Sequence, residues 1–81
     1  MKTALITGGG SGIGRQFCRL FAADAYRLVV FSLMQDELDD LALELQRDFP
    51  NIETVLVQKD VAQDGAAEEM LAYCEQKNLS I

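Results

Sequence analysis

Apolar residues occur along this chain either in short continuous runs or at helical spacing. Residues 28–31, Leu-Val-Val-Phe, form a run of β-branched, aliphatic and aromatic residues, which is typical of a strand buried on both faces of a parallel sheet. Shorter apolar runs occupy residues 4–6 and 55–57. The pattern therefore predicts three strands.

The segments that follow the first two strands repeat apolar residues every three or four positions, which predicts helices. The first helix is expected over residues 12–23, and the second from Gln35 or Asp36 to just before Pro50. The residues expected to face the core are Ile13, Phe17, Cys18, Leu20 and Phe21 in the first helix, and Leu38, Leu41, Ala42, Leu45 and Phe49 in the second.

A third helix is expected between Asp64 as its N-cap and Asn78 at its end. Its core-facing residues should be Ala67, Met70, Leu71 and Cys74. The order β-α-β-α-β-α predicts an α/β fold with a parallel sheet and right-handed crossovers. Strands added in sequence give the order 3-2-1, which is part of a Rossmann-type fold that forms three layers in the intact protein. We expect residues 1–81 to be the N-terminal part of one such domain, truncated before its fourth strand.

Length and charge narrow the classes of partner. A chain of 81 residues forms one domain at most. Its net charge of −6 argues against non-specific binding to nucleic acid or to anionic lipid, although a local backbone site can still hold a phosphate. No stretch approaches the ~20 apolar residues of a membrane span, and the apolar run near the N-terminus is too short for a signal peptide. We expect a cytoplasmic protein.

The chain has two cysteines and no histidine. Cys18 and Cys74 fall on the helix faces expected to be buried, so we interpret them as small core residues of a protein in a reducing compartment. Neither cysteine has metal-ligand spacing, and we expect no metal site. Without histidine, these residues cannot supply a histidine-based catalytic triad.

The segment from Thr7 to Gly14, Thr-Gly-Gly-Gly-Ser-Gly-Ile-Gly, lies between the first strand and the first helix, which is the context that a phosphate loop needs. The G-x-G-x-x-G template fails in every register. The P-loop template finds Arg15 in place of its lysine and Gln16 in place of its Ser or Thr, which argues against an NTPase. A simple turn would need only one or two of these glycines.

A third pattern, T-G-x-x-x-G-x-G, fits without mismatch, and with it the sequence resembles the short-chain dehydrogenase/reductase family. The resemblance extends to Asp60 and Val61 after the third strand and to the whole order of elements. It implies that the Ile13 amide binds the pyrophosphate, Ser11 the adenosine ribose and Asp60 the adenine amino group, with Val61 beside the ring. The alternative for Asp60 is a turn or helix cap at the strand end. The implied cofactor-binding set is Thr7, Gly8, Gly10, Ser11, Gly12, Ile13, Gly14, Ser32, Asp60 and Val61.

The end of the second strand decides between the two nicotinamide cofactors. An acidic residue there binds the ribose 2′-hydroxyl of NAD, whereas a basic residue accommodates the 2′-phosphate of NADP. Alignment places Ser32 at the acidic position and Leu33 at the basic one, so neither rule is met. The missing carboxylate favours NADP over NAD, and Arg15 could assist or could be an ordinary solvated helix residue.

The family resemblance implies a full-length oxidoreductase that transfers a hydride between the nicotinamide and a carbonyl or alcohol. The family's Asn-Asn-Ala-Gly segment and catalytic Ser and Tyr-x-x-x-Lys are expected beyond these 81 residues. Tyr73 and Lys77 match Tyr-x-x-x-Lys literally, but they lie in the third helix and are interpreted as neighbours at i and i+4. We therefore expect no turnover from this chain alone. A stand-alone NAD(P)-binding module, or an interaction protein on a degenerate dehydrogenase scaffold, are the alternatives.

An exposed apolar edge is expected on the first strand where a fourth strand would pair. Such an edge favours pairing with another copy. The chain is therefore expected to self-associate as a homo-oligomer, through that edge or the third helix.

Overall fold

The computed structural model describes residues 2–8, 12–60 and 62–79. All six expected elements are present, in the expected order. They are β1 (Thr3–Thr7), α1 (Gly12–Ala23), β2 (Arg27–Ser32), α2 (Gln35–Asp48), β3 (Thr54–Gln58) and α3 (Ala66–Gln76). No helix in these ranges is both long enough and apolar enough to cross a membrane.

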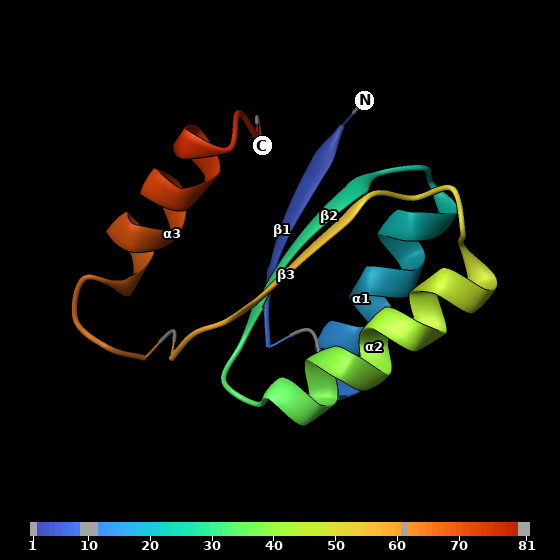
Figure 1. Ribbon diagram of the computed structural model, residues 1–81, viewed down its shortest axis with the longest axis horizontal. Coiled ribbons are helices and arrows are strands. Elements are labelled where there is room, and N and C mark those ends of the chain that lie inside the picture. The colour runs from blue at the N-terminus through green and yellow to red at the C-terminus, as the bar shows by residue number, and fades with distance from the viewer. Residues whose placement is uncertain (1, 9–11, 61, 80–81) are drawn as a thin grey trace.

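The three strands form one parallel sheet in the order β1-β2-β3, which confirms the partial Rossmann-type fold. Leu5 pairs with Val29, and Val29 pairs with Val55. Helices α1 and α2 cover one face of the sheet and α3 lies over the other (Figure 1). All three strands therefore end at one edge, which is called the carboxyl edge below, and the helices return the chain to the opposite, amino edge.

The central strand β2 contributes to both layers of the core. Leu28 and Val30 pack with α1 and α2, whereas Val29 and Phe31 pack with α3. Each of the four side chains is at most 1% exposed. A continuous apolar run is required here because successive strand residues point to opposite faces, and both faces are covered.

Helix α2 buries the leucines that the sequence predicts, Leu38, Leu41 and Leu45, but the prediction for α1 is wrong in part. Cys18 and Ala22 are its buried residues. The expected core residues Ile13, Phe17 and Leu20 are 72%, 48% and 63% exposed.

The small side chains of α1 face the sheet, which lets the helix pack closely against it. The larger ones form a stripe along its flank. A shallow groove lined by Leu5, Phe17 and Phe21 separates this stripe from β1.

Two expectations for α3 are also corrected. Asp64 is not its cap, because the N-cap is Gly65 in a left-handed conformation and no side-chain bond caps the helix. The buried residues are Ala66, Met70 and Cys74, whereas Leu71 is 54% exposed. Asn78 does close the helix, with a left-handed φ of 57°, and the Leu79 N–H donates to the Cys74 carbonyl over 2.8 Å.

Candidate functional site

The carboxyl edge of the sheet brings together the segments that the sequence marks as a binding site. The Gly8 N–H donates to the Phe31 carbonyl at 2.8 Å, and the Lys59 N–H donates to the Ser32 carbonyl at 2.8 Å. These bonds hold the residues that follow β1 and β3 beside the last two residues of β2. Ligands of open α/β sheets bind beyond this edge.

Two glycines of the loop after β1 have backbone conformations that favour glycine. Gly8 has φ of +67° and Gly12 has φ of +51°, and a Cβ atom added to either would have no neighbour within 4 Å. The conformation, and not crowding within the chain, therefore calls for glycine at both positions. The open space beside them lets a ligand approach the backbone closely.

Helix α1 begins directly at this glycine, and its first turn carries no acidic residue. The N–H groups of a first helical turn lack partners within the helix and carry partial positive charge. Thr7 ends β1, and Ile13 and Gly14 lie in this first turn. The residues present fit a diphosphate. Gly10, Ser11 and Val61 of the expected set lie outside the described residues.

The end of β2 is uncharged, and two apolar residues follow it. Ser32 is buried at 4% exposure, while Leu33 and Met34 are 57% and 51% exposed. The Gln58 side-chain amide donates to the Leu33 carbonyl at 3.0 Å, so β3 holds the backbone after β2 in place. Nothing in the sequence distinguishes Gln58 from other exposed strand ends, and sequence reasoning missed it.

The Asp60 carboxylate takes the turn role that was the alternative to binding adenine. Its Oδ1 accepts a hydrogen bond from the Ala62 N–H at 3.0 Å, and its carbonyl accepts from the Gln63 N–H at 3.3 Å. Among the residues that the structure describes, Oδ1 is the carboxylate oxygen of Asp60 that accepts a hydrogen bond. The turn fixes the direction of the carboxyl group at the carboxyl edge.

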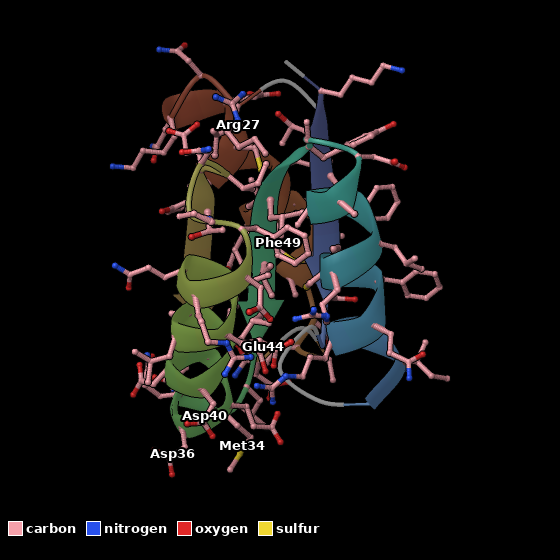
Figure 2. The ribbon with its side chains drawn as sticks, turned by 90° about the vertical axis from the view of Figure 1, so that its right-hand side faces the viewer. Arg27, Met34, Asp36, Asp40, Glu44 and Phe49 are labelled. Atoms are coloured by element: carbon pink, nitrogen blue, oxygen red, sulfur yellow. The ribbon has the colours of Figure 1, made fainter. Side chains whose placement is uncertain are left out.

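Arg15 forms an ion pair with Glu44 of α2. Its Nε and Nη2 atoms each lie 2.7 Å from Glu44 Oε1, and Arg19 Nη1 lies 2.7 Å from Glu44 Oε2. The hydrogen bonds from Arg19 and Arg15 lower the pKa of Glu44. Glu44 lies on the side of α2 that faces α1, with Asp40 and Asp36 closer to the start of the helix (Figure 2). Sequence reasoning missed Glu44, because the partners are 29 residues apart and only the packing of two helices joins them.

Tyr73 lies in α3 and lines a cavity with Gln58 and Lys59 on the α3 side of the carboxyl edge, whereas Lys77 follows the end of the helix. Tyr73 packs edge-on against Phe31 with ring centroids 5.9 Å apart, on the face of the sheet opposite to α1. The Lys77 ammonium lies 6.0 Å from the centre of the Tyr73 ring. The two residues are thus helix neighbours, in agreement with the sequence interpretation.

Both cysteines are buried and not disulfide-bonded. Burial is the main cause that raises the pKa of the Cys18 thiol to about 11, and the nearby Glu44 carboxylate adds to it. Burial also raises the pKa of Cys74. Neither thiol is thus an activated nucleophile at neutral pH.

Comparison with known proteins gives a consistent result. A profile described as short chain dehydrogenase matches residues 2–81. The chain is 40% identical to the L-xylulose reductase of Bos taurus over 86% of its own length and 26% of the relative. It is 35% identical to the 7beta-hydroxysteroid dehydrogenase of Collinsella aerofaciens over 88% of its length and 27% of the relative.

A solved structure agrees with these relatives. The alcohol dehydrogenase of Thermococcus sibiricus, complexed with 5-hydroxy-NADP, superimposes on the whole chain with a TM-score of 0.85 at 30% identity, and 34% of that protein is covered. The chain thus spans about a quarter to a third of the length of these proteins. It belongs to the short chain dehydrogenase family.

Proposed function

We propose that this chain binds the adenosine diphosphate part of a nicotinamide dinucleotide at the carboxyl edge of β1 and β2. The observation that carries the proposal is the pair of positive-φ glycines, Gly8 and Gly12, with open space beside them at the start of α1. A glycine loop that leads into a helix N-terminus is a binding site for pyrophosphate.

Four further residues of the expected set, together with Leu33, have roles in this proposal. The Ile13 amide in the first turn of α1 binds the pyrophosphate, and Ser11 binds the adenosine ribose. The exposed Leu33 side chain and Val61 flank the adenine ring. Asp60 accepts a hydrogen bond from the adenine amino group through Oδ2, while Oδ1 accepts from the Ala62 N–H.

The choice between the two dinucleotides follows from the end of β2. Ser32, which is buried, carries no carboxylate that would repel a 2′-phosphate at this strand end. We therefore propose NADP as the preferred cofactor and NAD as the alternative. The difference in affinity between NADP and NAD should be small, because residues 32–34 also carry no positive charge.

The full-length protein, in this proposal, is an oxidoreductase. The bound nicotinamide supplies hydride transfer to or from a carbonyl or alcohol, and the protein positions it. The names of the relatives, L-xylulose reductase and 7beta-hydroxysteroid dehydrogenase, support this class of substrate. We propose that the 81-residue chain binds without turnover, because the family's catalytic residues are expected outside it. The alternative is a stand-alone NAD(P)-binding module.

The test is a titration of the chain with NADPH and with NADH, followed by nicotinamide fluorescence. Saturable binding is expected. ADP-ribose should compete for the site and nicotinamide mononucleotide should not, because the residues assigned here contact only the adenosine diphosphate half. Competition by the mononucleotide alone, or no binding at all, would contradict the proposal.

We also propose that the chain self-associates through β1. In the sheet described here β1 pairs with β2 alone, and the apolar residues Ile13, Phe17 and Leu20 are exposed on the adjoining α1. Light scattering at micromolar concentration should give more than the monomer mass, and Phe17→Lys should return it to that of a monomer. A monomeric wild-type chain would refute the proposal.

A further inference from the structure

The cation closest in sequence to the glycine loop is Arg15, in the first turn of α1. A guanidinium in such a place could pair with the 2′-phosphate of NADP, since arginine recognises phosphate with two parallel hydrogen bonds. In the structure both its Nε and Nη2 atoms instead contact Glu44 Oε1 at 2.7 Å. These contacts use the Nε edge of the guanidinium and leave Nη1 without a contact to Glu44, but they direct the group toward α2 and balance its charge with a carboxylate.

Glu44 holds this position firmly because it also binds the next turn of α1. Its Oε2 accepts from Arg19 Nη1 at 2.7 Å, and the same Nη1 lies 2.8 Å from Asp48 Oδ2. The Glu44 side chain is only 17% exposed. Water and salt therefore screen this carboxylate less than they screen an ion pair at the surface.

The other cations of the chain do not offer a replacement. The seven basic residues are Lys2, Arg15, Arg19, Arg27, Arg47, Lys59 and Lys77. Four of them lie toward the amino edge of the sheet, namely Lys2 and Arg27 at strand starts and Arg47 and Lys77 at helix ends. Lys59, after β3, is ion-paired with Glu69 of α3, and Arg19 shares Glu44 and Asp48 as described.

Other acidic residues of α2 lie near Glu44 and affect how strongly a phosphate would depend on the charge of Arg15. Asp36 and Asp40 lie on α2 between Glu44 and the end that carries Met34 (Figure 2). Their carboxylates make the potential near the start of α2 more negative and unfavourable for a phosphate. A cation available at this point would therefore have a large effect on whether a 2′-phosphate binds.

We propose that Glu44 is a positioning residue that sets cofactor choice through Arg15. By directing the guanidinium toward α2 and balancing its charge, Glu44 weakens the attraction of Arg15 for the 2′-phosphate and keeps discrimination between NADP and NAD small. This inference rests on the proposed binding of a nicotinamide dinucleotide at the carboxyl edge. It goes further by assigning selectivity to a residue of α2 that lies outside the glycine loop and the end of β2.

The experiment compares dissociation constants for NADPH and NADH in four variants. Glu44→Gln should raise the preference for NADPH about tenfold, since it removes the carboxylate charge that balances Arg15 and leaves the guanidinium charge to attract the 2′-phosphate. Asp48→Asn is the matched control, because Asp48 contacts Arg19 but not Arg15, and it should change the preference less than twofold. Arg15→Gln in the wild-type background should also change it less than twofold, and in the Glu44→Gln background it should abolish the gain.

Thermal unfolding of each variant separates selectivity from loss of the fold, because a merely structural Glu44 would weaken the binding of both dinucleotides equally. Equal shifts in Glu44→Gln and Asp48→Asn would overturn the inference. If Glu44→Gln does not fold, Arg15→Gln alone decides, and a selective loss of NADPH binding in that variant refutes the role of Glu44. Failure of the wild-type chain to bind either dinucleotide overturns the proposed function, and the inference with it.

Discussion

Replacing Gly8 by alanine tests whether the loop conformation serves the fold, a ligand, or both. Gly8 has a φ of +67°, and its added methyl group would meet no atom of the chain within 4 Å. The cost to folding is therefore conformational and not steric. An L-residue in the left-handed region loses about 1–2 kcal/mol, and the lower entropy of the unfolded alanine chain offsets part of it.

A net loss of about 1 kcal/mol in the free energy of unfolding follows, equivalent to a fall in Tm of about 4–8 °C for a domain of this size. Gly65→Ala is the matched control. Gly65 has a φ of +80°, and a Cβ atom there would make only an ordinary contact, 3.9 Å from Glu68 Oε2. It caps α3, away from the glycine loop. Both substitutions should therefore destabilise the fold to a similar extent.

The two variants should differ in binding. The methyl group of Gly8→Ala would occupy the open space through which the pyrophosphate approaches the backbone in the proposed complex, and overpacking of this kind costs about 1–3 kcal/mol. We expect at least about a tenfold weaker affinity for NADPH, which corresponds to about 1.4 kcal/mol, while Gly65→Ala binds like the wild type. Urea unfolding and nicotinamide fluorescence measure the two quantities. Equal losses of affinity in both variants would show that general destabilisation explains the result and would refute the reasoning.

Three further outcomes are expected. Leu41→Ala, at a fully buried position, should lower the free energy of unfolding in urea by about 2–5 kcal/mol, whereas Leu43→Ala, 67% exposed on the same helix, should change it by less than about 0.5 kcal/mol. Hydrogen bonds from Arg19 and Arg15 lower the pKa of Glu44, so the stability that its carboxylate contributes is present above the unfolded pKa of 4.5 and is lost as the pH falls. Glu44→Gln should therefore make the free energy of unfolding depend less on pH in the acid range. An unchanged pH dependence would contradict the ion pairing of Glu44 with the two arginines. Iodoacetamide at pH 8 should modify Cys18 far more slowly in the native chain than in urea, since its native pKa is about 11, and equal rates would exclude a closed core there.

The elements of this fold were predictable because each has its own local pattern. The run from Leu28 to Phe31 is typical of a strand covered on both faces, and the spacing of Leu38, Leu41 and Leu45 is typical of one helix face. The glycine loop was equally visible, because a conformation with positive φ leaves its mark in residue type at Gly8 and Gly12.

Features that depend on packing were less visible. In α3, apolar residues stand next to one another, and the sequence does not decide whether Ala66 or Ala67 faces the core with Met70 and Cys74. In α1, the large Ile13, Phe17 and Leu20 suggest the buried face, but close approach to the sheet selects the smaller Cys18 and Ala22 instead. Size alone does not rank residues for burial where a helix must pack closely.

In the candidate site, too, the features with a local sequence pattern were predictable and those that depend on packing were not. The sequence indicated the residues at the ends of β1, β2 and β3, because a parallel sheet brings these ends together. It gave no sign that Asp60 would bind its own turn or that Glu44 would hold Arg15. Both contacts depend on side-chain directions that are fixed only when the chain is folded.

The central strand β2 restricts which amino-acid substitutions this sequence can accept. In a strand with one solvent-exposed face, every second position tolerates a polar residue, so substitutions that do not affect stability accumulate there. In β2, residues 28–31 each contribute to one of two cores and are at most 1% exposed. Four consecutive codons are therefore confined to apolar residues. Exchange at Leu28 or Val30 has to be compensated from α1 or α2, and exchange at Val29 or Phe31 from α3, so the two layers can change independently on either side of one fixed strand.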